Sequence, residues 1–419
     1  MGKNNLNVPA NKPTKDETQL LQQQEGDNLE PVAQVYTSDE EDTSTSAYLW
    51  LLVFSVLMFT FPFLTFYGVR SWLDESFEFS TFQTNCFSVL ASVIVVNFII
   101  CLYVYKAFRE DLKPRYVRVN TNLLSMEEAL TMLAKEEFRK LELPPFENYE
   151  DFLKAIQDLK EEEYMLDMHV DNLLIFHPKN KHYLACHQYT KERKFMLQDK
   201  GTCLVAELLH PPVGSTVLDM CAAPGMKTIH TCNVLQNQGI IYSVEQSPER
   251  YRILCNMTES AGCKIVQPIK GDALAITPEQ CPGVEYILVD PSCTGSGIQN
   301  RLSLEPEEKS PERLKKLAGL QIKMLSYAMS TFPDVKRIAY STCSLYEEEN
   351  EQVVQKCLQL NPNFKLLSGK KALRNKWRSV GSSEYKKIGK NCIYTRPEED
   401  LTDGIFIAIF EKCNSAGDE

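Results

Sequence analysis

Two cysteines, Cys293 and Cys343, stand in motifs that suit a reactive thiol. Cys293 lies in the run Asp-Pro-Ser-Cys-Thr-Gly-Ser-Gly, which begins at Asp290, and Cys343 lies in Ser-Thr-Cys-Ser. A thiolate can add to carbon 6 of a cytosine ring, and the enamine that forms can take a methyl group on carbon 5. This chemistry needs one activated thiol and gains from a second group that helps to release the base.

The sequence favours Cys343 as the activated thiol. Ser344 and Glu347 have the spacing of a capping box, which predicts a helix that runs from here to Leu360. A thiol at a helix N-terminus has a lowered pKa, and this favours the thiolate.

Cys293 and Asp290 are expected to assist. Cys293 suits removal of the carbon 5 proton or release of the covalent enzyme, and Asp290 can bond the base at its ring nitrogen as the thiolate adds. The alternative is that Cys293 and Cys343 are structural cysteines at strand ends.

A glycine loop, Asp-Met-Cys-Ala-Ala-Pro-Gly-Met-Lys-Thr, begins at Asp219 and suits a nucleotide-like cofactor. Its small residues let the backbone approach a ligand, while Glu245 can accept from ribose hydroxyls and Asp272 from an adenine edge. The loop alone does not exclude a dinucleotide dehydrogenase. The candidate cofactor-binding residues are Cys221, Ala222, Ala223, Pro224, Gly225, Met226, Lys227, Glu245, Asp272 and Asp290.

Short apolar runs separated by helical patterns surround these motifs. An apolar helix face recurs over residues 314–328, just before the strand that leads to Cys343. The alternation predicts an α/β fold with a Rossmann-like, doubly wound sheet, which binds ligands beyond the carboxyl ends of its strands. The expected strands are Thr216–Asp219, Ile240–Glu245, Ile265–Lys270, Tyr286–Asp290, Arg337–Ser341 and Ile405–Phe410.

These motifs resemble the Nop/Sun-domain RNA cytosine-5 methyltransferases. The likeness runs from about Lys113 to Lys412 and includes Leu-Gln-Asp-Lys, which ends at Lys200, and Glu-Asn-Glu, which begins at Glu349. Met226 replaces the second glycine of the usual loop, a position that also varies in subfamily five, which acts on large-subunit ribosomal RNA and which this sequence resembles most.

The resemblance implies an S-adenosyl-L-methionine-dependent methyltransferase that acts on RNA, and ribosomal RNA is the expected substrate. It also implies that Cys343 is the nucleophile and that Cys293 assists turnover. No metal is expected, because the cysteine spacings do not fit a metal site.

The overall charge of -11 disfavours a uniformly basic nucleic-acid binder, so local patches matter. One basic stretch with aromatics could follow a phosphate backbone and stack a base, or it could be a solvated loop. Its residues are Lys365, Lys370, Lys371, Arg374, Trp377, Arg378, Tyr385 and Lys386.

The N-terminal quarter has a different composition. Residues 1–46 are polar and acidic and are expected to form a disordered cytosolic tail. Two uncharged segments, about 47–69 and 84–105, are each long enough to cross roughly 30 Å of hydrocarbon. The basic residues after the second segment predict a hairpin with both tails in the cytosol. Within it, Asn97 could hydrogen-bond to the first span.

This part, about residues 40–112, resembles the vacuolar-ATPase assembly integral membrane protein family. The order of acidic tail, Phe-Pro-rich span, acidic loop, second span and Val-Tyr-Lys-Ala-Phe carries the likeness. It implies, as an alternative function, a chaperone of the endoplasmic reticulum membrane that helps the V0 sector of the proton pump to assemble.

The expected organisation is a tail over 1–46, a membrane hairpin over 47–112, a substrate-side region over 113–200 and a catalytic domain over 201–419. The two resemblances meet between Glu110 and Lys113. The chain is therefore either one membrane-tethered enzyme or two products joined here, in which case the methyltransferase part is expected in the nucleus or nucleolus.

Overall fold

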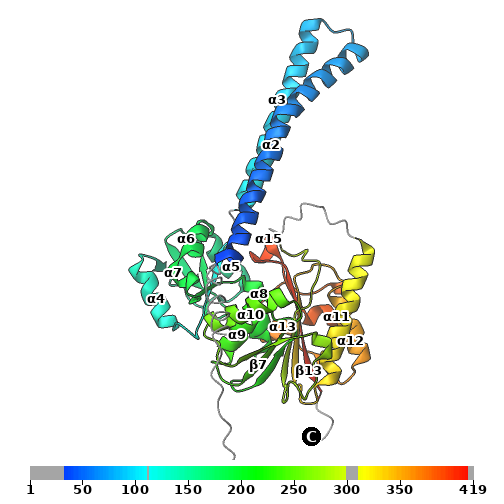
Figure 1. Ribbon diagram of the computed structural model, residues 1–419. Coiled ribbons are helices and arrows are strands. Elements are labelled where there is room, and N and C mark those ends of the chain that lie inside the picture. The colour runs from blue at the N-terminus through cyan, green and yellow to red at the C-terminus, as the bar shows by residue number, and fades with distance from the viewer. Residues whose placement is uncertain (1–32, 111–112, 299–309, 414–419) are drawn as a thin grey trace, which may run out of the picture. The chain divides into compact units, whose positions relative to one another are not determined.

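The computed structural model describes residues 33–110, 113–298 and 310–413, and gives only the backbone for 33–51 and 103–110. The chain divides into two compact units, residues 1–104 and 105–419. The first unit is helical, and the second contains two β-sheets with their helices (Figure 1).

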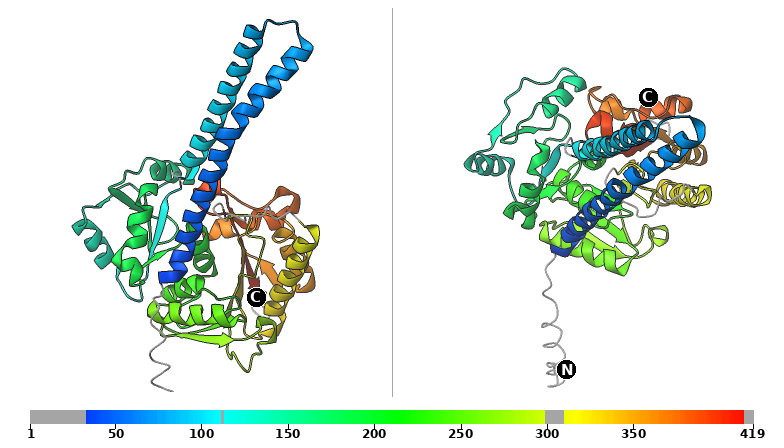
Figure 2. Two further views of the ribbon diagram at one scale, coloured as in Figure 1. Left: turned by 45° about the horizontal axis from the view of Figure 1, so that its top comes forward. Right: turned by 90° about the horizontal axis from the view of Figure 1, so that it is seen from above.

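The first unit consists of two long helices that lie side by side in all views (Figure 2). They are α2 (Ala33–Ser76) and α3 (Thr81–Glu110), whose end reaches into the second unit. Within the described residues, 52–76 and 81–102 are long and apolar enough to cross a membrane. The expected pair of apolar helices is confirmed.

The bounds of these helices differ from expectation. Residues 33–46 are helical instead of disordered, and residues 1–32 of the expected tail lie outside the described part of the chain. Extending a helix costs far less than starting one, so the apolar segment can carry the helix into its polar flank. The acidic loop expected between the two apolar segments is helical as far as Ser76. Within this helical part Arg70 and Asp74 form an ion pair at 3.8 Å.

Small polar residues line the contact between α2 and α3. Thr84 and Ser88 are buried, and the Ser92 hydroxyl donates to the Pro62 carbonyl across the helices at 2.9 Å. Their four-residue spacing lets two helices approach closely. Asn97 does not bond to the first helix as expected: it is exposed and donates to a carbonyl of its own helix at 2.9 Å. The four-residue spacing of Thr84, Ser88 and Ser92 continues at position 96, so Asn97 lies on a different face of α3.

The second unit begins with a five-stranded sheet in the order β2-β3-β4-β1-β5. All neighbours are antiparallel except β2 and β3. The strands are β1 (Arg115–Val119), β2 (Arg139–Lys140), β3 (Glu163–Leu166), β4 (Leu173–Phe176) and β5 (Phe195–Leu197). The helices are α4 (Met126–Lys135), α5 (Tyr149–Gln157), α6 (Lys181–Cys186) and α7 (Gln188–Lys191).

The larger, eight-stranded sheet has the order β11-β13-β10-β9-β6-β7-β8, with β12 also paired to β13. The strands from β10 to β8 are parallel, whereas β13 runs antiparallel to its neighbours. The strands are β6 (Thr216–Asp219), β7 (Ile240–Glu245), β8 (Val266–Lys270), β9 (Tyr286–Val289), β10 (Arg337–Thr342), β11 (Phe364–Leu366), β12 (Ile393–Thr395) and β13 (Ile405–Lys412).

Helices cover both faces of this sheet (Figure 1). They are α8 (Lys200–Leu209), α9 (Met226–Val234), α10 (Pro248–Ser260), α11 (Pro311–Thr331), α12 (Glu351–Leu360), α13 (Gly369–Ala372), α14 (Lys387–Asn391) and α15 (Pro397–Asp400). The six expected strands all exist within two residues of their expected bounds, and the Rossmann-like fold class is confirmed.

Alternation along the strands explains the two covered faces. Val217 belongs to the hydrophobic cluster that includes α8, and its neighbour Leu218 belongs to the cluster that includes α11. Ile287 and Leu288 divide between the same two clusters. Successive strand residues point to opposite faces, so an uninterrupted apolar strand fits a sheet that is buried on both sides.

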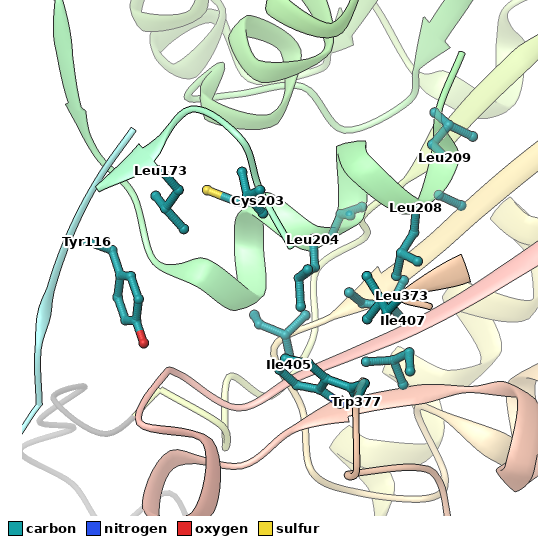
Figure 3. Close-up of a cluster of buried hydrophobic side chains, with 14 of the residues drawn as sticks. Tyr116, Leu173, Cys203, Leu204, Leu208, Leu209, Leu373, Trp377, Ile405 and Ile407 are labelled. Carbon is teal, nitrogen blue, oxygen red and sulfur yellow. The ribbon is translucent and has the colours of Figure 1, made fainter. Parts of the chain in front are cut away.

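Trp377 lies in the cluster that joins α8 to β13, beside Leu204 and Ile405 (Figure 3). Only 1% of it is exposed, and its ring N–H donates to the carbonyls of Ser379 and Tyr394, both at 2.9 Å. The expectation that Trp377 stacks a base is therefore wrong. The charges around it in the sequence did not show that the indole faces the core.

Candidate active site

The two motif cysteines meet at the carboxyl ends of neighbouring parallel strands. Cys293 follows β9 and Cys343 follows β10, and their Sγ atoms lie 3.0 Å apart. Both residues are partly exposed. Two thiols at this distance can reach the same base, as the expected division of roles between Cys343 and Cys293 requires.

Cys293 is the thiol of the pair that holds its proton. The hydrogen bond with Cys343 and burial together raise the pKa of Cys293 far above that of an ordinary thiol. Cys293 therefore keeps its proton at neutral pH and can donate it in a hydrogen bond to the Cys343 sulfur. Such an arrangement suits a nucleophile at Cys343.

The expected capping box after Cys343 is absent from the structure. Helix α12 begins at Glu351, and the Ser344 hydroxyl instead accepts from the Tyr346 amide at 3.1 Å. The chain first makes a turn that buries Glu349 and Asn350 completely. The argument from a helix N-terminus at Cys343 is therefore wrong, because these two side chains bond inward and delay the helix.

Asp290 is held between two donors at the end of β9. Lys227 Nζ lies 2.6 Å from Asp290 Oδ2, and the Ser341 hydroxyl donates to Oδ1 at 2.6 Å. Burial would lower the pKa of Lys227, but the Asp290 carboxylate raises it above its ordinary value. Lys227 therefore stays charged and fixes the direction of the Asp290 carboxylate, close to the two cysteines.

The glycine loop leads from β6 into α9. Gly225 has a φ of +114°, a conformation that glycine adopts without strain and that turns the chain into the helix at Met226. Asp219 is buried and accepts from the Thr228 hydroxyl at 2.7 Å, across the loop. Burial raises the pKa of Asp219 to about 6.

Arg250 ties this loop to the next strand. Its guanidinium donates to the Ala223 carbonyl at 2.7 Å and lies 3.4 Å from the Glu245 carboxylate. The Glu245 carboxylate also accepts from the Ser247 amide at 2.8 Å. Glu245 is thus fixed at the carboxyl end of β7, beside the loop, where an acceptor for a ribose is expected.

The remaining predicted cofactor residues occupy the same edge of the sheet. Ala222 and Ala223 are buried, and burial raises the pKa of Cys221, so this thiol is not an activated one. Asp272 is exposed after β8, and one of its oxygens accepts from the Leu274 amide at 3.0 Å. The narrow loop and the two carboxylates fit a nucleoside-containing cofactor.

Four residues at the site were given no functional role by the sequence analysis. Glu349 and Asn350 were noticed only as part of a family motif, and Gln321 and Arg250 were not singled out. All four act through contacts with residues distant in sequence. The only signal for Glu349 and Asn350 was a polar pair followed by an apolar helix pattern.

Two cations of the basic stretch, Lys365 and Arg378, are paired with acids. Lys365 pairs with Glu411 at 3.0 Å, and Arg378 lies 3.8 Å from Glu150. With Trp377 buried, these contacts favour a structural role for this stretch over a continuous phosphate-binding surface.

Three family models match the chain. The 16S rRNA methyltransferase RsmB/F model covers residues 206–411, and the ferredoxin-like domain of NOL1/NOP2/Sun domain family member 5 covers 113–198. A VMA21-like domain covers residues 46–108. Both resemblances seen in the sequence are confirmed.

Curated relatives carry the same activity in their names. The 28S rRNA (cytosine-C(5))-methyltransferase of Drosophila melanogaster is 62% identical over 304 residues, 73% of this chain and 70% of the relative. The 26S rRNA (cytosine-C(5))-methyltransferase nsun-5 of Caenorhabditis elegans is 36% identical, and the match covers 72% of this chain and 68% of the relative.

Solved structures agree with the fold. A methyltransferase homologue from Pyrococcus horikoshii has a TM-score of 0.56 at 24% identity and covers 73% of this chain and 88% of its own. NSun6 from the same organism has a TM-score of 0.54 at 23% identity, and the match covers 74% of this chain and 93% of that one. Fold and paired cysteines define a Rossmann-like methyltransferase. The chain belongs to the member-five family of rRNA (cytosine-C5)-methyltransferases.

Proposed function

We propose that this enzyme methylates carbon 5 of a cytidine in large-subunit ribosomal RNA through a covalent bond to Cys343. The contact of 3.0 Å between Cys293 and Cys343 carries the proposal, because it brings two thiols within reach of one base, and the raised pKa of Cys293 leaves Cys343 as the better candidate to attack. The names of the relatives support the choice of RNA and of the methylated atom.

In the proposed reaction the Cys343 sulfur adds to carbon 6 of cytosine, and the electron pair of the C5–C6 double bond moves to carbon 5. The proton of the Cys343 thiol passes to the ring nitrogen of the base, where charge develops, and returns to the sulfur on release. In between, the new N–H donates to the Asp290 carboxylate, which Lys227 and Ser341 hold. After methylation, carbon 5 loses its proton to water, the double bond re-forms and the Cys343 sulfur leaves. The Cys293 S–H stabilises that departing sulfur.

S-adenosyl-L-methionine is the proposed cofactor, and it supplies the methyl group. Glu245 would hold its ribose, Asp272 its adenine edge, and the backbone of residues 221–226 the rest, with Lys227 and Asp290 at the side of the base. The fit rests on Gly225, whose conformation keeps the loop narrow, and on the fixed Glu245 carboxylate.

The first test uses the full chain in lipid nanodiscs with an unmethylated large-subunit rRNA transcript. Cys343→Ala is expected to abolish methyl transfer, and Cys293→Ala to accumulate a protein–RNA adduct that survives denaturation. Full transfer by Cys343→Ala would refute the proposal. A turnover that leaves no adduct in Cys293→Ala would refute the role of Cys293 alone.

A second proposed function belongs to the hairpin. The VMA21-like match and the two apolar helices favour a role in assembly of the V0 sector of the vacuolar proton pump, in the endoplasmic reticulum membrane with both tails cytosolic. We further propose domains at 47–112, 113–200 and 201–419. Residues 1–112 alone should restore pump assembly in cells that lack the assembly factor, and failure of rescue would count against this function.

A further inference from the structure

Two adjacent buried side chains hold the two cysteine loops. Glu349 and Asn350 lie in the turn before α12, and both are 0% exposed. Glu349 bonds to a neighbour of Cys293, and Asn350 bonds to both neighbours of Cys343.

Glu349 holds the loop that carries Cys293. Its carboxylate accepts from the Thr294 hydroxyl at 2.6 Å and from the Thr294 amide at 3.1 Å. It also accepts at 2.9 Å from the side-chain amide of Gln321, which in turn contacts the Ser292 carbonyl at 3.1 Å. The residues before and after Cys293 are thus tied to one carboxylate.

Asn350 holds the loop that carries Cys343. Its side-chain oxygen accepts from the Thr342 hydroxyl at 2.6 Å. Its side-chain nitrogen lies 2.8 Å from both the Ser344 carbonyl and the Tyr394 hydroxyl. The residues before and after Cys343 are therefore also tied to one side chain.

We propose that Glu349 and Asn350 are positioning residues that divide the reaction between them: Asn350 aligns Cys343 for addition to the base, and Glu349 aligns Cys293 for release of the adduct. The proposal rests on the proposed function. Since the two residues are consecutive, the backbone of one turn fixes the spacing of the two sulfurs.

The division follows from the chemistry of the two steps. Addition forms the bond between the Cys343 sulfur and carbon 6, and needs only Cys343 in place. Release breaks that bond as the carbon 5 proton passes to water, and needs the Cys293 S–H close to the departing sulfur. Errors in the alignment of a reacting group lower the rate of the step in which it takes part.

Conservative substitutions should separate the steps. Glu349→Gln puts an N–H group among Thr294 and Gln321, which are donors to the present carboxylate, and so loosens the Cys293 loop. Asn350→Asp removes the N–H that meets the Ser344 carbonyl and loosens the Cys343 loop. The matched control is Glu348→Gln, because Glu348 is the exposed neighbour of Glu349.

The experiment compares two transcripts of large-subunit rRNA with the full chain in nanodiscs. One contains cytidine and reports turnover. The other contains 5-fluorocytidine, which has no proton on carbon 5 to lose, so after addition and methyl transfer it stops at the adduct and reports the steps before release.

We expect Glu349→Gln to turn over about 10-fold more slowly or worse while its adduct forms on the fluorinated transcript within about 2-fold of the wild-type rate. On the cytidine transcript it should accumulate adduct. Asn350→Asp should lose both reactions by about 10-fold without accumulation, and Glu348→Gln should match the wild type. A merely structural defect would lower both reactions in Glu349→Gln.

Thr294→Val and Thr342→Val test the same contacts from the opposite side and keep the shape of the side chain, should either buried variant fail to fold. They should repeat the Glu349→Gln and Asn350→Asp patterns respectively. Equal losses of addition and turnover in Glu349→Gln and Thr294→Val, or wild-type turnover in both, would overturn the proposal. Activity in Cys343→Ala would instead refute the proposed function itself.

Discussion

At the scale of single residues, burial changes the acid–base chemistry of Asp219 at the start of the cofactor loop. Its pKa rises from 3.8 to about 6 because little solvent reaches the carboxylate. A carboxyl group with a higher pKa in the folded than in the unfolded chain binds protons more readily when folded. It therefore adds stability as the pH falls through 6, and this contribution is complete below the unfolded pKa.

We expect the wild type to gain about 1.4 kcal/mol relative to Asp219→Asn when the pH falls from 7.5 to 5, since only the wild type takes up this proton on folding. The measurement is urea unfolding of both proteins at the two pH values. The difference between the proteins removes the effect of groups that they share. An equal change in both, or a loss in the wild type, would contradict the burial argument.

The sequence identified the reacting residues better than their supports. Cys293, Cys343 and Asp290 were predicted from their motifs, and the structure brings all three to one edge of the sheet. The role of Glu349 could not be predicted because its partners are Thr294 and Gln321, which are 55 and 28 positions away along the chain. A local pattern holds no information about such contacts.

At the scale of elements, the catalytic loop after β9 docks on β13 through two glycines. The Gly404 amide donates to the Gly297 carbonyl at 2.8 Å, and the Gly297 amide donates to the Cys343 carbonyl at 2.9 Å. A Cβ on Gly297 would lie 2.1 Å from the Gly404 oxygen, so backbone would have to move. The glycine pair therefore fixes the distance between the loop and the sheet.

Gly297→Ala is expected to lower methyl transfer by about 100-fold, because a displacement of roughly 1 Å at a reacting group has effects of that size. Gly319→Ala is the matched control. Its Cβ would meet nothing within 4 Å in α11, and alanine should stabilise the helix by roughly 0.5–1 kcal/mol. Rates measured with the rRNA transcript would contradict the docking argument if Gly297→Ala were as active as Gly319→Ala.

A second element-level prediction concerns the hairpin. Ser92→Ala removes the contact with the Pro62 carbonyl and should weaken the association of α2 with α3 by about 0.6 kcal/mol, the usual size of such bonds in bilayers. Asn97→Ala should change it less, since Asn97 bonds within its own helix. Steric trapping in bilayers measures both, and a larger effect of Asn97→Ala would refute the assignment of the contact face.

Strand positions could be predicted from sequence because an apolar run buried on both faces is readable residue by residue, as at Tyr286–Val289. The turn after Cys343 could not be predicted. A capping box requires Ser344 to meet the amide three residues on, whereas the buried bonds of Asn350 draw the chain inward first. Tertiary contacts thus overrode a valid local signal.

At the scale of the whole molecule, two matches with unrelated names adjoin without overlap. The VMA21-like match ends at residue 108, and the ferredoxin-like match begins at 113. Lys113 is already part of the enzyme, because its ammonium lies 2.9 Å from Asp199 and 2.5 Å from Asp403. Few residues are therefore available between the end of the hairpin and the first anchored residue of the methyltransferase.

A short connection of this kind makes a membrane-tethered methyltransferase the expected product of an uninterrupted chain. Antibodies to residues 1–112 and to residues 113–419 should then detect one band near 47.9 kDa. After carbonate extraction this band should stay in the membrane pellet, and the same pellet should contain the activity that transfers methyl groups to the rRNA transcript. As a control, a version that lacks residues 1–112 should leave the pellet. Two shorter bands, each with one epitope, would mean that the hairpin and the methyltransferase work as separate proteins, the second free to reach the nucleolus.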